Sequence, residues 1–209
     1  MGKQRMQRGA AVGAAENGNT VVLVTLDAGG ECRDRRRLDL TDGLPTHPYH
    51  HEGSWAVGRY LGSPWAREIS LPEAVTLVKR VQAAAAVGAQ EGLAALAEAL
   101  RQPITRIAIR VCPVLPPTIE ERIADTRAAA VADSILYRQA LAAAGQARGW
   151  SVSWYDRDQV VGAAAATLDG RDLAAHLSAM GRALGPPWQA QHRLAATAAL
   201  AALGAGSDG

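Results

Sequence analysis

Short apolar runs alternate along the chain with longer segments in which apolar residues recur at helical spacing. The first apolar run is TVVLVTL at residues 20–26, which is followed by Asp27 and Gly29-Gly30. A β-branched run bounded by turn residues is typical of a buried strand that ends in a turn. We expect a second strand at residues 31–40, paired with the first across the DAGG turn.

The second of these strands is strongly basic. Side chains alternate between the two faces of a strand, so Arg33, Arg35 and Arg37 should share one face. Because Lys and Arg neutralise phosphates in nucleic-acid complexes, this face is a candidate phosphate-binding surface. A solvated hairpin strand would carry the same residues, and the sequence leaves both interpretations open.

Two capping boxes mark the starts of helices. Ser70 and Glu73 form the first, and a proline lies in the first turn, so a helix should begin there and continue to residue 87. Gly88 should separate this helix from a second one at residues 90–102.

The second capping box is formed by Thr118 and Glu121. It predicts the start of one long helix over residues 118–149. Apolar residues recur near helical spacing within it, which supports that assignment. Further helices are expected at residues 157–168, 171–184 and 189–204.

Strands are expected between these helices at residues 104–112 and 150–156. The segment 41–69 is rich in Gly and Pro and contains SWAVGRYLG at 54–62, which could form another short strand. This order of elements predicts an α/β chain with one mixed sheet.

The chain of 209 residues suits a single domain. We place this domain at residues 20–204. Residues 1–19, which are polar and rich in Gly and Ala, are predicted to be a flexible tail, and so are residues 205–209.

Composition limits the possible classes of protein. The net charge of +2 is too small to indicate nucleic-acid binding by itself. Two cysteines, Cys32 and Cys112, provide neither a disulfide framework nor a CxxC metal pair, so reduced thiols are expected. There is no secretory signal pattern, and charged residues interrupt the alanine-rich runs, so we expect a cytoplasmic protein without membrane spans.

Three stretches resemble the ribonuclease H-like superfamily, in its Holliday-junction resolvase-like branch. VVLVTLDAGG resembles the first strand with its acid and glycine turn. The segment from IAIRVC through ADSILYRQALAAAGQARGWSVSWYDRDQV resembles the central strand, long helix and following strand. HRLAATAALAAL resembles the terminal helix. The resemblance covers about residues 20–204 and implies a mixed five-stranded sheet flanked by helices.

The resemblance implies cleavage of nucleic-acid phosphodiesters with two divalent metal ions, Mg²⁺ or Mn²⁺, held by acidic residues. Asp27 matches the first-strand acid, and His192 matches the first ligand position of the terminal helix. The central-strand position usually filled by glutamate falls on Arg110, and the second terminal-helix position falls on Ala195 or Ala196. The acidic motif is therefore incomplete in this chain.

Two interpretations of this incomplete motif stay open. In the first interpretation the active site is degenerate and the fold is retained for binding. Arg110 could then hold a phosphate through two hydrogen bonds. Alternatively, other acids complete the site. The candidates are Glu52, Glu120, Glu121 and Asp125, although the last three stand where a helix N-terminus favours carboxylates anyway.

The segment THPYHHEGSW at residues 46–55 gathers histidines and an acid within a few positions. The residues are His47, His50, His51 and Glu52. Their spacing matches no helical metalloprotease signature, and adjacent His50 and His51 would point to opposite sides of an extended segment. Two metal ligands from this loop are feasible and three are not. We expect the loop to complete the site beside Asp27, as ligand or as general acid and base.

The sequence thus favours a ribonuclease H-like protein that binds structured DNA or RNA, with metal-dependent nuclease activity if the site is complete. A catalytically inactive scaffold or regulatory protein is the alternative, and a small-molecule hydrolase that uses the histidine loop is a third candidate. Nucleic acid is the expected partner, and a homodimer is a further candidate assembly. Aromatic residues could stack on bases or provide the large side chains of the core: Trp55, Tyr60, Trp65, Trp150, Trp154, Tyr155 and Trp188.

Overall fold

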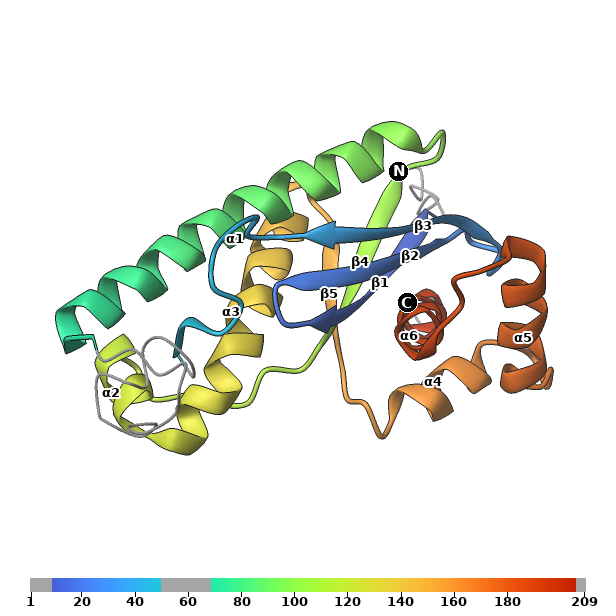
Figure 1. Ribbon diagram of the computed structural model, residues 1–209. Helices are drawn as coiled ribbons and strands as arrows, with labels where there is room; N and C mark the ends of the chain where they lie inside the picture. The colour runs from blue at the N-terminus through green and yellow to red at the C-terminus, as the bar shows by residue number, and fades with distance from the viewer. Residues whose placement is uncertain (1–8, 50–68, 206–209) are drawn as a thin grey trace, which may run out of the picture.

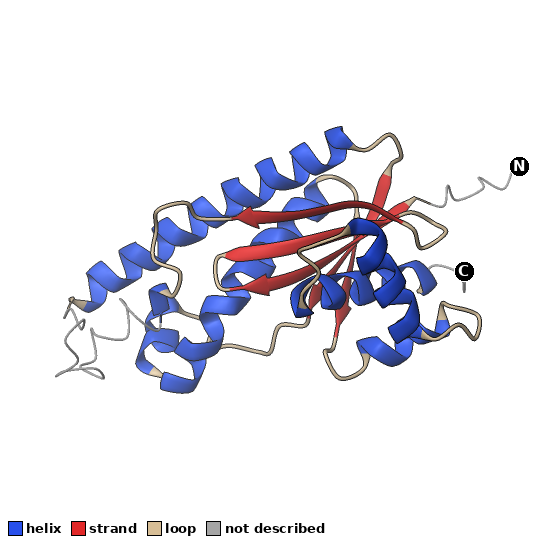
Figure 2. Cartoon of the chain, turned by 45° about the vertical axis from the view of Figure 1, so that its right-hand side comes forward, coloured by secondary structure: helices blue, strands red, loops and turns tan. Residues whose placement is uncertain are grey.

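The computed structural model describes residues 9–49 and 69–205, which form a five-stranded mixed sheet flanked by helices (Figures 1 and 2). The sheet order is β3-β2-β1-β4-β5. β1, β2 and β3 form an antiparallel meander, and β4 and β5 run parallel to β1. The α/β fold class and the mixed five-stranded sheet predicted from the sequence are confirmed. The strands are β1 (Ala10–Asn17), β2 (Thr20–Leu26), β3 (Cys32–Asp39), β4 (Ile104–Arg110) and β5 (Ser151–Tyr155).

The central strand β1 lies within residues 1–19, so the prediction of a flexible tail is wrong for residues 10–17. β1 has the sequence AAVGAAEN and pairs with β2 along its length through a turn at Gly18-Asn19. Its small side chains are required because helices approach it closely. A Cβ atom at Gly13 would overlap the carbonyl of Ala195 and the backbone nitrogen of Ala199.

Helices cover both faces of the sheet (Figure 1). α1 and α3 pack on one face in the larger apolar cluster, and α4, α5 and α6 pack on the other face. The tyrosines Tyr49 and Tyr137 and many Leu and Ile side chains fill the first layer, whereas alanines dominate the second. The helices are α1 (Leu71–Ala99), α2 (Ile119–Ala124), α3 (Thr126–Ala147), α4 (Val160–Ala166), α5 (Leu173–Leu184) and α6 (Ala190–Gly204).

α1 is one continuous helix, so the predicted division at Gly88 is wrong. A Cβ atom at Gly88 would overlap the backbone of Leu40, which follows β3. Glycine at this position therefore allows a strand end to approach the helix, at an intrinsic cost of about 1 kcal/mol relative to alanine. The capping box of Ser70 and Glu73 forms as predicted.

The predicted long helix over residues 118–149 is instead divided at Asp125. The Asp125 backbone is extended, and its side chain accepts hydrogen bonds from the N–H groups of Arg127 and Ala128. Asp125 therefore ends α2 and caps α3. The capping box of Thr118 and Glu121 forms at the start of α2.

The strand predicted at 54–62 and the aromatics Trp55, Tyr60 and Trp65 lie outside the described residues. Within the described ranges, no helix is both long and apolar enough to span a membrane.

Candidate functional site

Three parallel strands end at the same edge of the sheet. β1 ends at Asn17, β4 at Arg110 and β5 at Tyr155. We call this the carboxyl edge. In open α/β sheets, ligands bind outside the carboxyl ends of the strands, so this edge is the first place to look for a site.

A buried ion pair between Glu16 and Arg138 occupies the carboxyl edge. Glu16 stands near the end of β1, and Arg138 comes from α3. Arg138 Nε lies 2.7 Å from Glu16 Oε1, and Arg138 Nη1 donates to the carbonyl of Val111 at 2.8 Å. Their side chains are only 7% and 6% exposed, respectively. The guanidinium therefore neutralises the carboxylate and joins the ends of β1 and β4.

Two weakly acidic groups lie near this pair. Burial raises the pKa of Tyr155, the Glu16 carboxylate raises it further, and the Tyr155 hydroxyl donates to the carbonyl of Ala14 at 2.9 Å. Burial also raises the pKa of the Cys112 thiol, an effect that the nearby Arg138 opposes only in part. Both groups therefore stay protonated near neutral pH.

The start of the histidine-rich segment is attached to the carboxyl edge. The Tyr137 hydroxyl donates to the carbonyl of Thr46 at 2.7 Å, and the Tyr49 N–H donates to Asp133 Oδ1 at 2.9 Å. The Thr46 hydroxyl lies 3.3 Å from Asn19 Oδ1, in the turn region that joins β1 to β2. Two side chains of α3 thus hold residues 46–49 beside the end of β1.

Of the predicted histidine motif, only His47 belongs to the described residues. His50, His51 and Glu52 lie outside them. His47 lies near Gly18, in the turn after β1. Its neighbouring strand is therefore β1, and the acid nearest the end of that strand is Glu16.

Asp27 lies at the opposite end of the sheet from this turn. It follows β2, whose seven residues run back along β1 from Thr20. At about 3.3 Å per residue, β2 spans about 20 Å. The structure therefore does not bring Asp27 together with Thr46 or Tyr49. His50, His51 and Glu52, the residues expected beside Asp27, lie outside the described residues.

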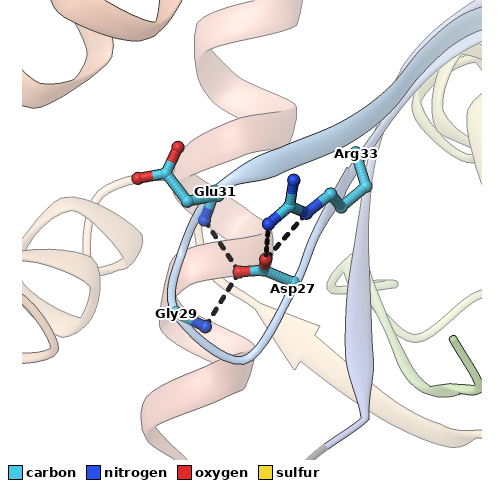
Figure 3. Close-up of polar contacts among 4 residues, drawn as sticks. All are labelled: Asp27, Gly29, Glu31 and Arg33. Carbon is cyan, nitrogen blue, oxygen red and sulfur yellow. Dashed lines mark hydrogen bonds and ion pairs between the residues drawn. The ribbon is translucent and has the colours of Figure 1, made fainter.

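The polar contacts of Asp27 are those of a turn residue (Figure 3). Its Oδ1 accepts hydrogen bonds from the N–H groups of Gly29 and Glu31, and its Oδ2 accepts one from Arg33 Nε at 2.7 Å. Partial burial raises the pKa of Asp27, but the hydrogen bonds from Glu31, Arg33 and Gly29 outweigh it and hold the pKa below its ordinary value. The assignment of Asp27 as first-strand acid depended on taking β2 for the first strand.

His192 lies in the first turn of α6, on the face of the sheet opposite Arg138. Its Nδ1 accepts the N–H of Gln189 at 3.2 Å, and its ring centroid lies 5.9 Å from that of Trp188. Burial lowers the pKa of His192, and the positive charge of Arg35 lowers it further. His192 thus acts as a neutral helix cap in this arrangement.

The donor set at the carboxyl edge does not fit two divalent metal ions. Glu16 is paired with Arg138, and Ala195 and Ala196 are fully buried against the sheet. In residues 9–49 and 69–205, no three His, Cys, Asp or Glu side chains are grouped to hold a metal ion.

The other candidate acids belong to α2 and its neighbour. Glu121 accepts the N–H of Thr118 at 3.0 Å, and Asp125 caps α3. Glu120 lies in the first turn of α2. Their positions agree with the interpretation of these acids as helix-terminal residues.

Two of the four predicted phosphate-binding arginines have specific partners within the protein. Arg33 pairs with Asp27, and Arg35 donates to the carbonyls of Gly185 and Pro187 at 2.9 and 2.6 Å. Arg35 therefore fixes the GPPW segment against β3.

The other two arginines, Arg37 and Arg110, share one row across the sheet near the carboxyl edge. Arg37 is opposite Val22 and Val22 is opposite Ala15. The β1–β4 register pairs Gly13 with Ala108, and two residues further along it Ala15 corresponds to Arg110. Both side chains point to the face that α6 covers. Three strand spacings of about 4.8 Å separate their backbones by about 14 Å.

The sequence analysis did not identify Glu16 and Arg138, because it did not predict β1. The signal was the Gly18-Asn19 dipeptide, which lies between two apolar runs and favours a two-residue hairpin turn. Gly18 has a φ of 59°, the left-handed conformation that such a turn requires.

No protein-family profile matches this chain, and no curated protein matches it. The solved structures that match this chain include two of RuvC. Thermus thermophilus RuvC in complex with a Holliday junction substrate has a TM-score of 0.51 and 14% identity, over 94% of each chain. Another structure of Thermus thermophilus RuvC has a TM-score of 0.46 and 13% identity, over 94% of this chain and 95% of that one. The first similarity shows that the chain has the ribonuclease H-like fold.

Proposed function

We propose that this ribonuclease H-like chain binds structured nucleic acid, with branched DNA as its ligand and the carboxyl edge as its binding surface. The observation that carries this proposal is the fold similarity to RuvC in complex with a Holliday junction, which extends over 94% of each chain. The charges near the ends of β1 and β4 support it, because Glu16 is paired with Arg138 and the arginines Arg37 and Arg110 lie close by.

Arg37 and Arg110 are the proposed phosphate contacts. Arg37 is exposed, its guanidinium lying 3.5 Å from the Thr20 hydroxyl, and Arg110 is half-buried at the end of β4. An arginine binds phosphate through a planar pair of N–H groups, which suits both positions. The 14 Å between their backbones, about three strand spacings, lets the two contact separate phosphates.

The proposal assigns binding, and not metal-dependent cleavage, to the described residues. Two-metal cleavage needs carboxylates that converge on both ions. The pairing of Glu16 with Arg138 favours an inactive binding protein over a nuclease, because a carboxylate held by a buried guanidinium is a poor metal ligand. A Mg²⁺ or Mn²⁺ nuclease would need ligands from His50, His51 and Glu52, which lie outside the described residues.

Binding is tested by fluorescence anisotropy with a labelled four-way junction and a duplex of the same length, in EDTA. We expect tighter binding to the junction and an affinity that falls steeply with salt. Replacing Arg110 with Ala should reduce the slope of log K against log[salt] by about 0.9. Arg101→Ala is the matched control, because Arg101 is exposed just before β4, at the other end of that strand.

Absence of binding to any of these DNAs at about 20 mM salt would refute the proposal, because electrostatic affinity is greatest there. Incubation of the labelled junction with Mg²⁺ or Mn²⁺ separates the two functional classes. Cleavage that survives repurification would show that the chain is a nuclease, and intact junction would support the binding protein.

A further inference from the structure

The pairing between β1 and β4 stops before the two strands reach the carboxyl edge. Gly13 and Ala108 form its last pair, although both strands continue toward that edge. Carried three residues further, the same register sets Glu16 opposite Val111. Arg110, a proposed phosphate contact, therefore lies in a part of β4 that, within the described residues, pairs with β5 and not with β1.

Two side chains join β1 to its neighbours where these ladder bonds end. On the face that α3 covers, Arg138 contacts the Glu16 carboxylate through Nε and donates from Nη1 to the carbonyl of Val111. On the face that α6 covers, the Tyr155 hydroxyl of β5 donates to the carbonyl of Ala14. Both side chains are buried, so these bonds are shielded from water.

Arg138 holds the residue that directly follows Arg110. The Val111 N–H donates to the carbonyl of Tyr155 at 2.9 Å, and the Val111 carbonyl accepts from Arg138 at 2.8 Å. After Val111 the connector to α2 contains neither helix nor strand, and Val114 within it is 99% exposed. Arg138 is therefore the side chain that links the end of β4 to β1.

We propose that Arg138 is a positioning residue for nucleic-acid binding, which fixes through Val111 the backbone from which Arg110 reaches a phosphate. Arg138 and Arg110 project from opposite faces of the sheet, so Arg138 acts through the backbone. Arg138 is only 5% exposed and does not contact the phosphate itself. An arginine that is held in place before the phosphate arrives loses less conformational freedom on binding, which raises affinity. This inference rests on the proposed function and adds to it a residue that the nucleic acid does not touch.

The charge of Glu16 offers a different explanation for any effect of Arg138. Without the guanidinium, a carboxylate would be left near the proposed phosphate contact and would repel nucleic acid. The double variant Glu16→Leu with Arg138→Met separates the two explanations, because it removes both charges and keeps the net charge of the wild type. It still removes the hydrogen bond to the Val111 carbonyl.

The experiment measures anisotropy of the labelled four-way junction in EDTA over a range of salt concentrations, with full-length variants whose folding is checked by circular dichroism. Arg110→Ala, the double variant and the triple variant that combines them form a cycle. We expect the double variant to reduce the slope of log K against log[salt] by about 0.9, as Arg110→Ala does. The triple variant should also lose about 0.9 and not about 1.8, because Arg110 without its support no longer contacts a phosphate.

Two further variants complete the set. Arg127→Met is the matched control and should leave the slope unchanged, because Arg127 is an exposed arginine of the same helix. Arg138→Lys keeps a positive charge beside Glu16, but lysine lacks the planar fork that holds a carboxylate and a carbonyl together. We therefore expect Arg138→Lys to reduce the slope as well.

A folded double variant with the wild-type slope would overturn the positioning role and leave the proposed function intact. If the double variant does not fold, a wild-type slope in Arg138→Lys has the same consequence. A triple variant that loses about twice as much as Arg110→Ala would also refute positioning, because the two arginines would then act independently. An unchanged slope in Arg110→Ala would remove the contact that Arg138 is proposed to support. Failure of the wild type to bind any DNA at low salt would refute both this inference and the proposed function.

Discussion

The ion pair between Glu16 and Arg138 gives the sharpest test of how the carboxyl edge is built. Replacing Arg138 with Met keeps a long side chain in α3 but leaves the Glu16 carboxylate buried without its counter-ion. Both side chains are less than a tenth exposed, so solvent screens the pair little. Removing one partner of such a pair costs about 3–5 kcal/mol, against a total stability of about 5–15 kcal/mol for a domain.

The double variant Glu16→Leu with Arg138→Met should recover much of this loss. Replacing a buried pair with apolar residues of similar volume is often neutral or stabilising. The carbonyl of Val111, which accepts from Arg138 Nη1, would lose a hydrogen bond in both variants, at about 1 kcal/mol. We therefore expect the double variant to lie within about 2 kcal/mol of the wild type.

Urea unfolding followed by circular dichroism measures these free energies of unfolding. Arg127→Met is the matched control, because Arg127 is an exposed arginine of the same helix and should change stability by less than about 0.5 kcal/mol. A loss below about 1 kcal/mol for Arg138→Met would refute the buried-pair reasoning. So would a double variant as unstable as the sum of its two single variants.

Two further predictions concern the turn at Asp27 and the packing of β1. Asp27→Asn should lower stability by at most about 1 kcal/mol at pH 7 and leave DNA binding unchanged, because it removes only a partly exposed ion pair with Arg33. Since the folded-state pKa of Asp27 lies below its ordinary value of 3.8, the difference in urea unfolding should disappear as the pH falls toward 2, and a difference that persists there would contradict this origin. Gly13→Ala should lower the free energy of unfolding by about 3 kcal/mol or more, because the alanine methyl group would overlap the backbone of α6 at Ala195. Gly162→Ala is its control, because a Cβ there meets no atom within 4 Å and should raise the melting temperature slightly.

The sequence predicted most elements of the fold because local chemistry determines them. The capping boxes at Ser70 and Thr118 fixed two helix starts, and the apolar run at 20–26 fixed β2. β1 was missed because its alanines and Gly13 are selected by the close approach of α6, a tertiary contact that leaves no β-branched pattern. Local propensity says little about a central strand of this kind.

Because β1 was not predicted, β2 was taken for the first strand when the first-strand acid was assigned. With β2 taken as the first strand, Asp27 stood in the position of a first-strand acid, although antiparallel pairing sends β2 toward the opposite edge. Likewise, Arg138 is one arginine among many in the sequence. Its role depends on α3 placing it within 2.7 Å of Glu16, which no spacing along the chain reveals.

The changes at the carboxyl edge are not independent of the packing around them. The resemblance implies carboxylates near the ends of β1 and β4 and in the terminal helix. In this chain Glu16 is paired with Arg138, and Arg110 is the last residue of β4. The backbone of Ala195 lies against Gly13, and a larger side chain at position 13 would force α6 away from the sheet. A single Arg110→Glu substitution would therefore supply a carboxylate without freeing Glu16 or adding a ligand on α6. Because two metal ions need several converging oxygen ligands, building such a centre from the described residues would require coordinated changes in α3, β4 and α6.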